Sequence, residues 1–475
     1  MQINMGFLTF VIILISSFSS SNTFELSQER IKKLDEIINS LMKLAKLKTV
    51  GFIITNSTDT IYQNIYGETD KVNTKSPFVL GSVSKSFTSL ALLHLNISLN
   101  KTLDKYGLKD YIKDDDAKLI TISELLNHSS GLDSFSSNRI YEKGYFNYSN
   151  YGFALLGKII EKESKIKYEE YMKETIFKPL NMVNTHAKYN SDIVDSYDFF
   201  LGIRTKYKNI ESEIGDGFFI PAGYVSSSIE DMGNYLRFYL NASEENQYYV
   251  KQMTESNLTV SYNVKYGMGL FIQKKNGQFI YHHSGSTSSF LSNLVIYPEL
   301  DIGFFIVTNT RDSLCLGPSN EFFKNIEDYL IYDSYDGIDN SSFFYHHFTY
   351  DILYLFIISI PLIYLIITII RKIKLKKYLW FFGIKGKILF GIDLFLLIIA
   401  PLIVIILSYT FDPTLRIIID MIKDIKLIIF APSSILFFIF LIKLVYFFAY
   451  NKFSEKYDLN NKKIENMDLD YMGVD

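Results

Sequence analysis

Apolar and polar residues follow two different periods in the first part of the chain. Residues 27–46 place apolar side chains at helical spacing along one side, which predicts an amphipathic helix. Residues 50–56 and 60–67 are rich in β-branched and aromatic residues and are separated by a polar turn signal, Ser57 to Asp59, which predicts a β-hairpin. A long and mostly helical middle follows the hairpin.

Strand patterns return near residue 277. Three strands are predicted at residues 277–285, 290–298 and 302–309, and an amphipathic helix at residues 319–333. Strands from both ends of such a segment can join one sheet that helices cover. We therefore predict an α+β fold, with an antiparallel sheet flanked by helices and an all-helical insert between the early and late strands.

The last third of the chain contains three long apolar runs. Residues 352–370, 388–407 and 427–448 each approach or reach the roughly 20 apolar residues that cross a hydrocarbon core of about 30 Å. A buried helix of a globular domain can mimic one such run, but three in succession favour membrane spans. We predict a region of three transmembrane α-helices within residues 346–450.

Charge gives these predicted spans an orientation. The loop at residues 371–387 is rich in lysine, so the positive-inside rule places it and the tail, residues 451–475, in the cytoplasm. Residues 1–21 hold a short apolar core followed by small residues, which is typical of a signal peptide, although an uncleaved anchor has a similar pattern. Both features place residues 22–345 outside the cytoplasm. We expect a multi-pass protein of the plasma membrane or secretory pathway.

Charge and composition also restrict the partners. The chain has 48 Lys and Arg against 51 Asp and Glu, a net charge of −3, so nucleic-acid binding has no electrostatic support. His282 and His283 are adjacent on a predicted strand and point to opposite faces, which argues against a metal site. We expect no metal and no organic cofactor, and the sequence leaves the oligomeric state open. Export would also make sequons such as Asn56 and Asn96 candidates for glycosylation.

A serine and a lysine one helical turn apart begin an apolar run at residues 79–95. Gly81 allows a sharp turn, the helix N-terminus offers free N–H groups near the Ser82 hydroxyl, and the i to i+3 spacing puts Lys85 on the same face. A desolvated lysine favours its neutral form and can accept the serine proton. The stretch alone favours a helix start in which Ser82 or Ser84 is the N-cap and Lys85 reaches solvent.

Two further motifs change this balance. The sequence YSN at residues 148–150 precedes a predicted helix, and HSG at residues 283–285 ends a predicted strand. Each has a plain structural interpretation, with Tyr148 packed near a helix start and Asn150 as an N-cap. In this order, however, the three motifs resemble those of the penicillin-recognising serine enzymes, the serine β-lactamases and D,D-peptidases.

The resemblance is to the branch with a tyrosine in the second motif. This branch comprises class C β-lactamases, D-alanyl-D-alanine carboxypeptidases and related esterases and aminopeptidases. Residues 121–132 and 220–232 are similar to non-catalytic signature segments of the same branch, and the resemblance covers approximately residues 28–333. It implies the β-lactamase/D,D-peptidase-like fold for the exported domain.

The resemblance implies a catalytic role for three residues. Ser82 would be the acylated nucleophile and Lys85 its activating partner. Tyr148 would carry protons to and from the leaving group as a general base whose pKa Lys85 holds down, a division of roles that differs across the superfamily. His128 is expected to be a structural turn residue, and Ser84 the nearby serine whose substitution matters least.

The remaining motif residues would bind the substrate. Asn150 would hydrogen-bond the substrate amide and orient Lys85. His283 would line the cleft and Gly285 would let the substrate backbone approach, while the backbone N–H groups of Ser82 and Ser286 would form an oxyanion hole. Better-known members have lysine where this chain has His283, and a histidine is more often neutral at pH 7, which argues against efficient β-lactam hydrolysis.

These features predict a membrane-anchored serine hydrolase that cleaves an amide or ester in a small peptide or ester substrate. The lipid bilayer would be its other partner, through the three C-terminal helices. The alternative is a catalytically inactive receptor or scaffold that keeps the penicillin-binding shape. A fold kept only for binding does not need Ser82, Lys85, Tyr148 and Asn150 together, which favours the enzyme.

Overall fold

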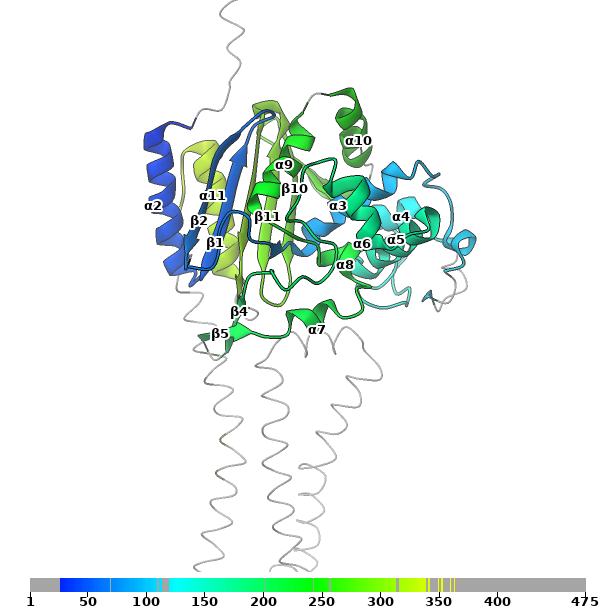
Figure 1. The fold of residues 1–475 in the computed structure, drawn as a ribbon, viewed down its shortest axis with the longest axis horizontal. Coiled ribbons are helices and arrows are strands. Elements are labelled where there is room, and N and C mark those ends of the chain that lie inside the picture. Colours follow the sequence, from blue (N-terminus) through cyan, green and yellow to red (C-terminus); the bar gives the residue numbers. More distant parts are fainter. Residues whose placement is uncertain are drawn as a thin grey trace, which may run out of the picture. The chain divides into compact units, whose positions relative to one another are not determined.

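A computed structural model describes residues 26–338 except 69, 109–110, 113–118, 201, 242, 256–257 and 313–315, together with positions 341, 349, 352, 359 and 363 (Figure 1). The chain divides into two compact units, residues 1–199 with 203–344 and residues 200–202 with 345–475, and only the first is considered below. The predicted signal peptide, the tail and all but three residues of the predicted spans lie outside the described residues. Among the described residues, no helix is long and apolar enough to cross a bilayer.

The predicted antiparallel sheet is present, and it unites strands from both ends of the domain. Within the described residues it has eight strands in the order β2-β1-β12-β11-β10-β9-β8-β7, with antiparallel neighbours throughout. The early hairpin joins the late strands where Val50 of β1 pairs with Thr308 of β12. The strands are β1 (Thr49–Thr55), β2 (Thr60–Gly67), β7 (Leu258–Ser261), β8 (Val264–Tyr266), β9 (Phe271–Lys275), β10 (Gln278–Ser286), β11 (Leu291–Tyr297) and β12 (Ile302–Thr308).

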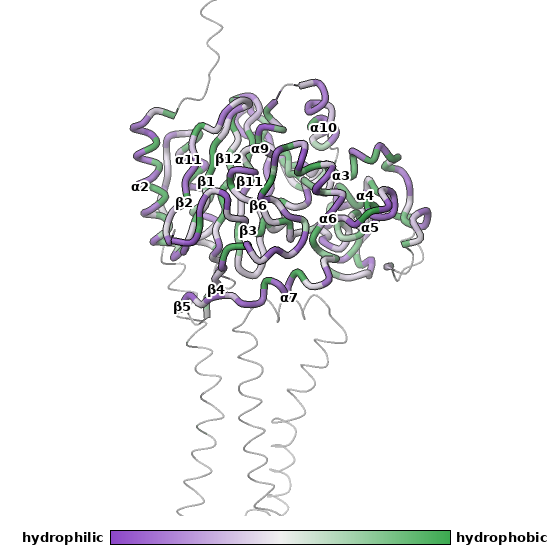
Figure 2. The backbone as a smooth tube through the Cα atoms, in the orientation of Figure 1, coloured by the Kyte–Doolittle hydropathy of each residue, from purple (hydrophilic) through white to green (hydrophobic). Residues whose placement is uncertain are grey.

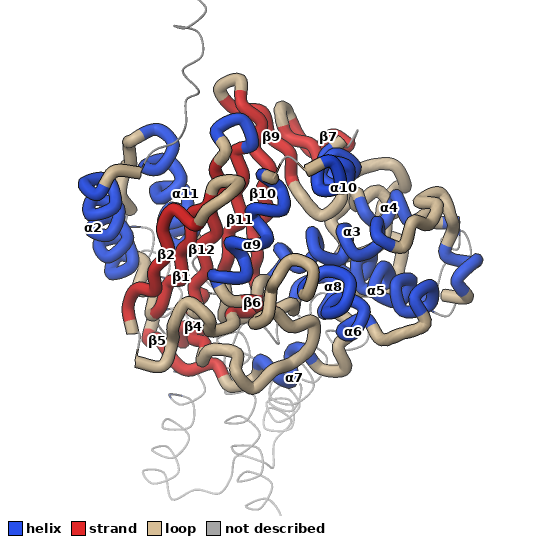
Figure 3. Tube along the Cα trace, turned by 45° about the horizontal axis from the view of Figure 1, so that its top comes forward, coloured by secondary structure: helices blue, strands red, loops and turns tan. Residues whose placement is uncertain are grey.

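Helices cover both faces of the sheet (Figures 1 and 3). The terminal helices α2 (Gln28–Leu44) and α11 (Gly317–Tyr332) pack on one face, against a core that includes Phe304. Helix α9 (Ile229–Leu240) and the helical part of the domain pack on the other, against a core that includes Phe305. Successive side chains of a strand point to opposite faces of the sheet. Because helices cover both faces, β1, β11 and β12 are buried along their whole length.

The helix α2 illustrates why these segments take their places. Polar and apolar residues alternate along it (Figure 2), and Ser27 caps its N-terminus by accepting a hydrogen bond from the backbone N–H of Arg30. Its apolar residues recur every three or four positions, so they form one side of the helix. That side alone is buried, through Leu34, Ile37, Ile38, Leu41 and Met42.

The segment between β2 and β7 is not wholly helical, which corrects the prediction of an all-helical insert. It contains a two-stranded pair, β3 (Phe78–Val79) with β6 (Ser226–Ser227), and the strands β4 (Ser196–Phe200) and β5 (Ile203–Tyr207). The strands β3 and β6 have two residues each, too few to show a period of two. The helices of this segment are α3 (Ser84–His94), α4 (Ile122–Leu126), α5 (Asn150–Ser164), α6 (Tyr168–Met172), α7 (Ile210–Ile214), α8 (Ile220–Gly223) and α10 (Glu244–Thr254).

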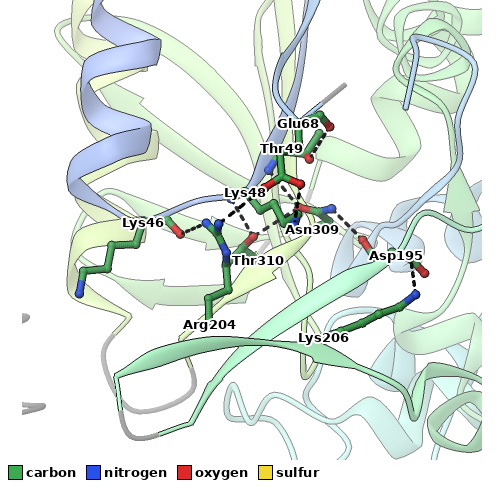
Figure 4. Close-up of polar contacts among 9 residues, drawn as sticks. All are labelled: Lys46, Lys48, Thr49, Glu68, Asp195, Arg204, Lys206, Asn309 and Thr310. Atoms are coloured by element: carbon green, nitrogen blue, oxygen red, sulfur yellow. Dashed lines mark hydrogen bonds and ion pairs between the residues drawn. The ribbon is translucent and has the colours of Figure 1, made fainter. Parts of the chain in front are cut away.

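Polar contacts fasten the β4–β5 strands to the end of the main sheet (Figure 4). The backbone N–H of Thr49 donates to Asn309 Oδ1 at 3.1 Å, and Asn309 Nδ2 donates to the carbonyl of Asp195 at 2.7 Å. Arg204 Nη1 donates to the carbonyl of Lys46 at 3.0 Å. The short strand β13 (Thr310–Arg311), which follows β12, pairs in parallel with β4. The strand β13 is therefore held both by β12, which it follows in the chain, and by β4, with which it pairs.

Candidate active site

Ser82 lies in a tight turn that leads into the buried helix α3. Gly81 has φ +57°, a conformation that glycine adopts without strain, and the 3₁₀ turn Gly81–Val83 continues directly into α3. Ser82 stays partly exposed, whereas Lys85 one turn later is fully buried. Lys85 Nζ donates to Ser82 Oγ at 3.0 Å, to Asn150 Oδ1 at 2.6 Å and to the carbonyl of Ala222 at 2.6 Å.

Burial lowers the pKa of Lys85 well below its ordinary value of 10.5. The three groups that accept its hydrogen bonds are a hydroxyl, an amide and a carbonyl, so none of them contributes a negative charge. Desolvation disfavours the ammonium form of such a lysine. The ammonium form can donate to all three groups, whereas a neutral amine uses its two hydrogens for Asn150 and Ala222 and turns its lone pair to Ser82 Oγ. The structure thus brings a serine hydroxyl to within hydrogen-bond distance of an amine whose pKa burial lowers.

Tyr148 and Asn150 lie at the start of α5. The helix is capped by Ser149, whose Oγ accepts from the N–H of Gly152 at 3.0 Å, so Asn150 is the first helical residue and not the N-cap. The N–H of Ser149 donates to Nδ1 of the buried His128 at 3.1 Å. The His128 ring also contacts the Tyr148 ring, with centroids 4.3 Å apart. His128, with φ +61°, is the structural turn residue that we expected.

The electrostatics of Tyr148 differ from the expectation. Burial raises the pKa of the phenol, although a hydrogen bond with Ser82 acts in the opposite direction. Lys85 Nζ lies 4.7 Å from the centre of the Tyr148 ring, over its face. The hydrogen bond with Ser82 lowers the pKa of the phenol, whereas the Lys85 amine, over the ring face, does not offset the effect of burial. The prediction that Lys85 holds the pKa of Tyr148 down is therefore wrong, and the resting phenol carries its proton.

His283 is on the strand β10, and the residue is only 2% exposed. Its Nδ1 lies 2.7 Å from the carbonyl of Ser284, and its Nε2 lies 3.2 Å from the hydroxyl of Tyr266. Burial lowers its pKa to about 3. Since a carbonyl can only accept, Nδ1 carries the proton and Nε2 accepts from Tyr266.

This arrangement corrects the expectation that His283 lines the cleft. Both of its nitrogens are occupied within the protein, and its ring packs among Tyr148, Tyr266 and Phe271. The neighbouring His282 stacks on Phe271 with ring centroids 5.5 Å apart. The position that carries a cation in better-known relatives therefore holds a neutral, internally bonded imidazole.

Gly285 brings β10 against the turn that holds Ser82. A Cβ atom at Gly285 would lie 1.9 Å from the carbonyl oxygen of Leu80, and one at Gly81 would lie 2.3 Å from the backbone nitrogen of Ser286. Only glycine at both positions permits this approach. The side chain of Ser292 on β11 completes the contact by donating to the Leu80 carbonyl at 2.7 Å.

The direction of the Ser286 N–H follows from the strand pairing. Thr287 N donates to Phe290 O at 3.0 Å, so the pair of Ser286 with Leu291 is of the type that exchanges no hydrogen bonds. The Ser286 N–H therefore points away from β11, and β9 on that side pairs only as far as His282. It faces the turn of Ser82, whose own N–H belongs to a helix start without intrahelical partners. The two predicted oxyanion donors thus flank the same space.

Ser84 is more firmly held than expected. It is fully buried, and its Oγ donates to the carbonyl of Gly81 at 2.7 Å and accepts from the N–H of Val225 at 3.0 Å. The hydroxyl therefore connects the nucleophile turn to the segment after α8. Removal of the hydroxyl would leave the buried N–H of Val225 without this acceptor, whereas the Gly81 carbonyl also accepts from the Ser84 backbone N–H, so we expect a cost in stability. That substitution of Ser84 matters least for acylation stays a prediction.

Two groups at the site were not found from the sequence. The carbonyl of Ala222 accepts from Lys85, and it lies in the segment 220–232 that was recognised only as a non-catalytic signature. Tyr266 bonds His283, and it lies on the three-residue strand β8, which has no sequence period. In the part of the chain that the structure describes, no cluster of three His, Cys, Asp or Glu side chains is arranged to hold a metal.

The chain is similar to known proteins over most of the described domain. The family model described as Beta-lactamase matches residues 34–320. Beta-lactamase-like protein 4 of Dictyostelium discoideum is 26% identical over 340 residues, which cover 59% of this chain and 60% of that protein. Protein flp of Staphylococcus aureus, strain MRSA252, is 24% identical over 324 residues, which cover 60% of this chain and 64% of that protein. The chain thus spans less than two thirds of these curated relatives.

A solved structure has the same fold. The octameric penicillin-binding protein homologue from Pyrococcus abyssi superimposes with a TM-score of 0.53 at 24% sequence identity. The match covers 63% of this chain and 77% of that one. At this identity the likeness concerns the fold, an α+β arrangement with an antiparallel sheet covered by helices.

Proposed function

Because the chain belongs to the beta-lactamase family of serine hydrolases, we propose that it hydrolyses an amide or ester through an acyl-enzyme on Ser82. The observation that carries this proposal is the 3.0 Å contact between Ser82 Oγ and the fully buried amine of Lys85. A neutral amine at this distance can take the serine proton as the oxygen attacks.

In the acylation step, Ser82 Oγ forms a bond to the substrate carbonyl carbon and its proton passes to Lys85 Nζ. The carbonyl oxygen becomes negatively charged next to the N–H groups of Ser82 and Ser286. Collapse of the tetrahedral intermediate breaks the bond to the leaving group. The leaving group takes a proton from Tyr148, whose phenol is protonated at rest, and Lys85 returns its proton to the phenolate.

In the deacylation step, water attacks the acyl carbon and loses its proton to the same Lys85 and Tyr148 pair. The bond between the acyl carbon and Ser82 Oγ breaks, and the serine recovers its proton. Asn150, which accepts from Lys85 Nζ at 2.6 Å, keeps the amine aimed at Ser82 throughout. Removal of any one of these groups should reduce the rate without abolishing binding of the substrate.

The site favours an acyl donor whose recognition does not depend on a cation at the third motif. His283 is neutral and both its nitrogens are engaged, so it does not supply a positive charge to a substrate carboxylate. We infer that simple esters or peptides are better substrates than penicillins. The membrane anchor and the location outside the cytoplasm belong to the same proposal, on the basis of the apolar runs after residue 345.

Labelling of the full-length chain with a fluorophosphonate tests this function. We expect covalent labelling of the wild-type chain, and none of a Ser82→Ala variant with the same thermal unfolding temperature. A fluorescent penicillin and a chromogenic ester, used in parallel, compare the two kinds of acyl donor. A chain that reacts with none of these donors would be the inactive receptor and not a hydrolase.

A further inference from the structure

One peptide group next to the predicted oxyanion hole lies between two charged side chains. Arg311 Nη1 donates to the carbonyl of Thr287 at 2.6 Å, and the N–H of Ser288 donates to Glu213 Oε1 at 3.2 Å. This carbonyl and this N–H belong to the same planar peptide unit. Its negative end therefore faces a cation and its positive end faces an anion, and hydrogen bonds to ionised groups are stronger than neutral ones.

The two charged residues come from elements outside β10. Glu213 is on the short helix α7, and Arg311 is on β13. The strand β13 is held by its parallel pairing with β4, in which Arg311 lies opposite Asp198. Contacts of Asn309 and Arg204 fix the same region (Figure 4). The Thr287–Ser288 peptide is thus held by side chains of α7 and β13, which supply none of the site residues described above.

This peptide begins one residue after Ser286. Ser286 is exposed, and β9 ends before reaching it, so among the described residues the Ser82 turn, and not a strand, lies on that side of β10. The pairing with β11 sets the direction of the Ser286 N–H, whereas the place of this strand end relative to the Ser82 turn depends on how the chain is held at Thr287 and Ser288. A shift of the peptide between these two residues would carry the end of β10, and the Ser286 N–H with it, away from the Ser82 turn.

Glu213 has a second contact that reaches the opposite side of the site. The Tyr224 hydroxyl donates to Glu213 Oε1 at 2.9 Å. Tyr224 directly follows α8, whose residue Ala222 supplies the carbonyl that accepts from Lys85. One carboxylate therefore contacts both the chain after the oxyanion donor and the chain after the lysine acceptor.

We propose that Glu213 and Arg311 are positioning residues that hold the end of β10, and with it the Ser286 N–H, in place at the developing oxyanion. Neither touches Ser82, and both act through the Thr287–Ser288 peptide. The inference rests on the proposed acylation of Ser82, which it deepens. A displacement of about 1 Å at a reacting centre costs up to about 100-fold in rate, so loss of either charged group should slow acylation by about 10- to 100-fold.

The test uses full-length chain in detergent, two probes of the tetrahedral site and one chromogenic ester substrate. Fluorophosphonate labelling gives the acylation rate, and the affinity of an aryl boronic acid reports the stability of a tetrahedral adduct. We expect Glu213→Ala and Arg311→Met to lower the labelling rate and the affinity for the boronic acid by about 10- to 100-fold. The KM for a chromogenic ester should stay within about twofold of wild type. Glu213→Gln should recover most of the loss, because its amide oxygen still accepts from Ser288 and Tyr224.

Glu211 provides a matched control, since it lies on the same helix with an exposed side chain. Glu211→Ala should leave both readouts unchanged. Labelling of Glu213→Ala at the wild-type rate would overturn the inference, and so would a loss that follows thermal stability and is not rescued by Glu213→Gln. A wild-type chain that is not labelled at all would refute the proposed function itself, and the role of both residues with it.

Discussion

The substitution Gly285→Ala probes the close approach of two backbones on which the candidate site depends. The new Cβ would lie 1.9 Å from the Leu80 carbonyl oxygen and 2.3 Å from Ser292 Oγ, and contacts under 3.0 Å do not persist. Leu80 has little freedom to yield, because its carbonyl already accepts from Ser292. The difference between 3.0 and 1.9 Å requires β10 and the Ser82 turn to separate by about 1 Å.

This separation moves the Ser286 N–H away from the Ser82 N–H. We expect the rate of acylation to fall by about 100-fold, while the overpacked contact lowers the free energy of unfolding by about 1–3 kcal/mol. Stopped-flow release of a chromogenic leaving group measures the first quantity. Urea unfolding followed by circular dichroism measures the second.

Gly277→Ala separates the loss of rate from a loss of stability. Gly277 lies between β9 and β10 with φ +84°, and a Cβ atom added there would meet no atom of the described residues within 4 Å. Alanine there is strained by about 1–2 kcal/mol but crowds nothing in that part of the chain. It should therefore acylate at the wild-type rate. If Gly285→Ala also acylates at that rate, the backbone contact does not position the oxyanion donors, and the reasoning is refuted.

Three other predictions concern the groups around Ser82. Lys85→Arg should slow fluorophosphonate labelling by about 10²- to 10⁴-fold, because a guanidinium keeps its proton. Labelling of the wild-type chain should rise with pH until Lys85 is neutral. Equal labelling rates of Lys85→Arg and wild type would contradict the role of Lys85 as proton acceptor. Acidification from pH 6.5 towards 3 should lower the free energy of unfolding of the wild type more than that of His283→Gln. The reason is that His283 binds a proton in the unfolded state and excludes it in the folded state. An equal loss of stability in the two proteins, measured by urea unfolding, would contradict this prediction. Ser84→Ala should cost about 1–3 kcal/mol in urea unfolding, because the buried N–H of Val225 loses its acceptor and Gly81 O keeps only its bond from the Ser84 backbone N–H. Unchanged stability would contradict the bridging role of Ser84.

The sequence predicted the elements whose pattern is local and long. The hairpin of β1 and β2, the strands β10, β11 and β12, and the helices α2 and α11 all carry clear periods, and the structure confirms them. The strands β7, β8 and β9 have three to five residues each and owe their place to pairing beside β10. Tertiary pairing of this kind leaves no local signal.

The same distinction applies to the candidate site. The contact between Ser82 and Lys85 could be predicted because residues three apart share one face of a helix. The ring of His283 could not be placed, because its partner Tyr266 comes from a strand that the sequence does not reveal. The pKa of Tyr148 depends on burial, which is a property of the folded chain and not of a motif.

Rapid-quench mass spectrometry of the full-length chain during turnover of a chromogenic ester tests the acyl-enzyme most directly. We expect the wild-type mass to rise by that of one acyl group, with the group on the peptide that contains Ser82 and a slower rise in Lys85→Met. An acyl group on another residue, or turnover that continues in Ser82→Ala, would contradict nucleophilic catalysis by Ser82.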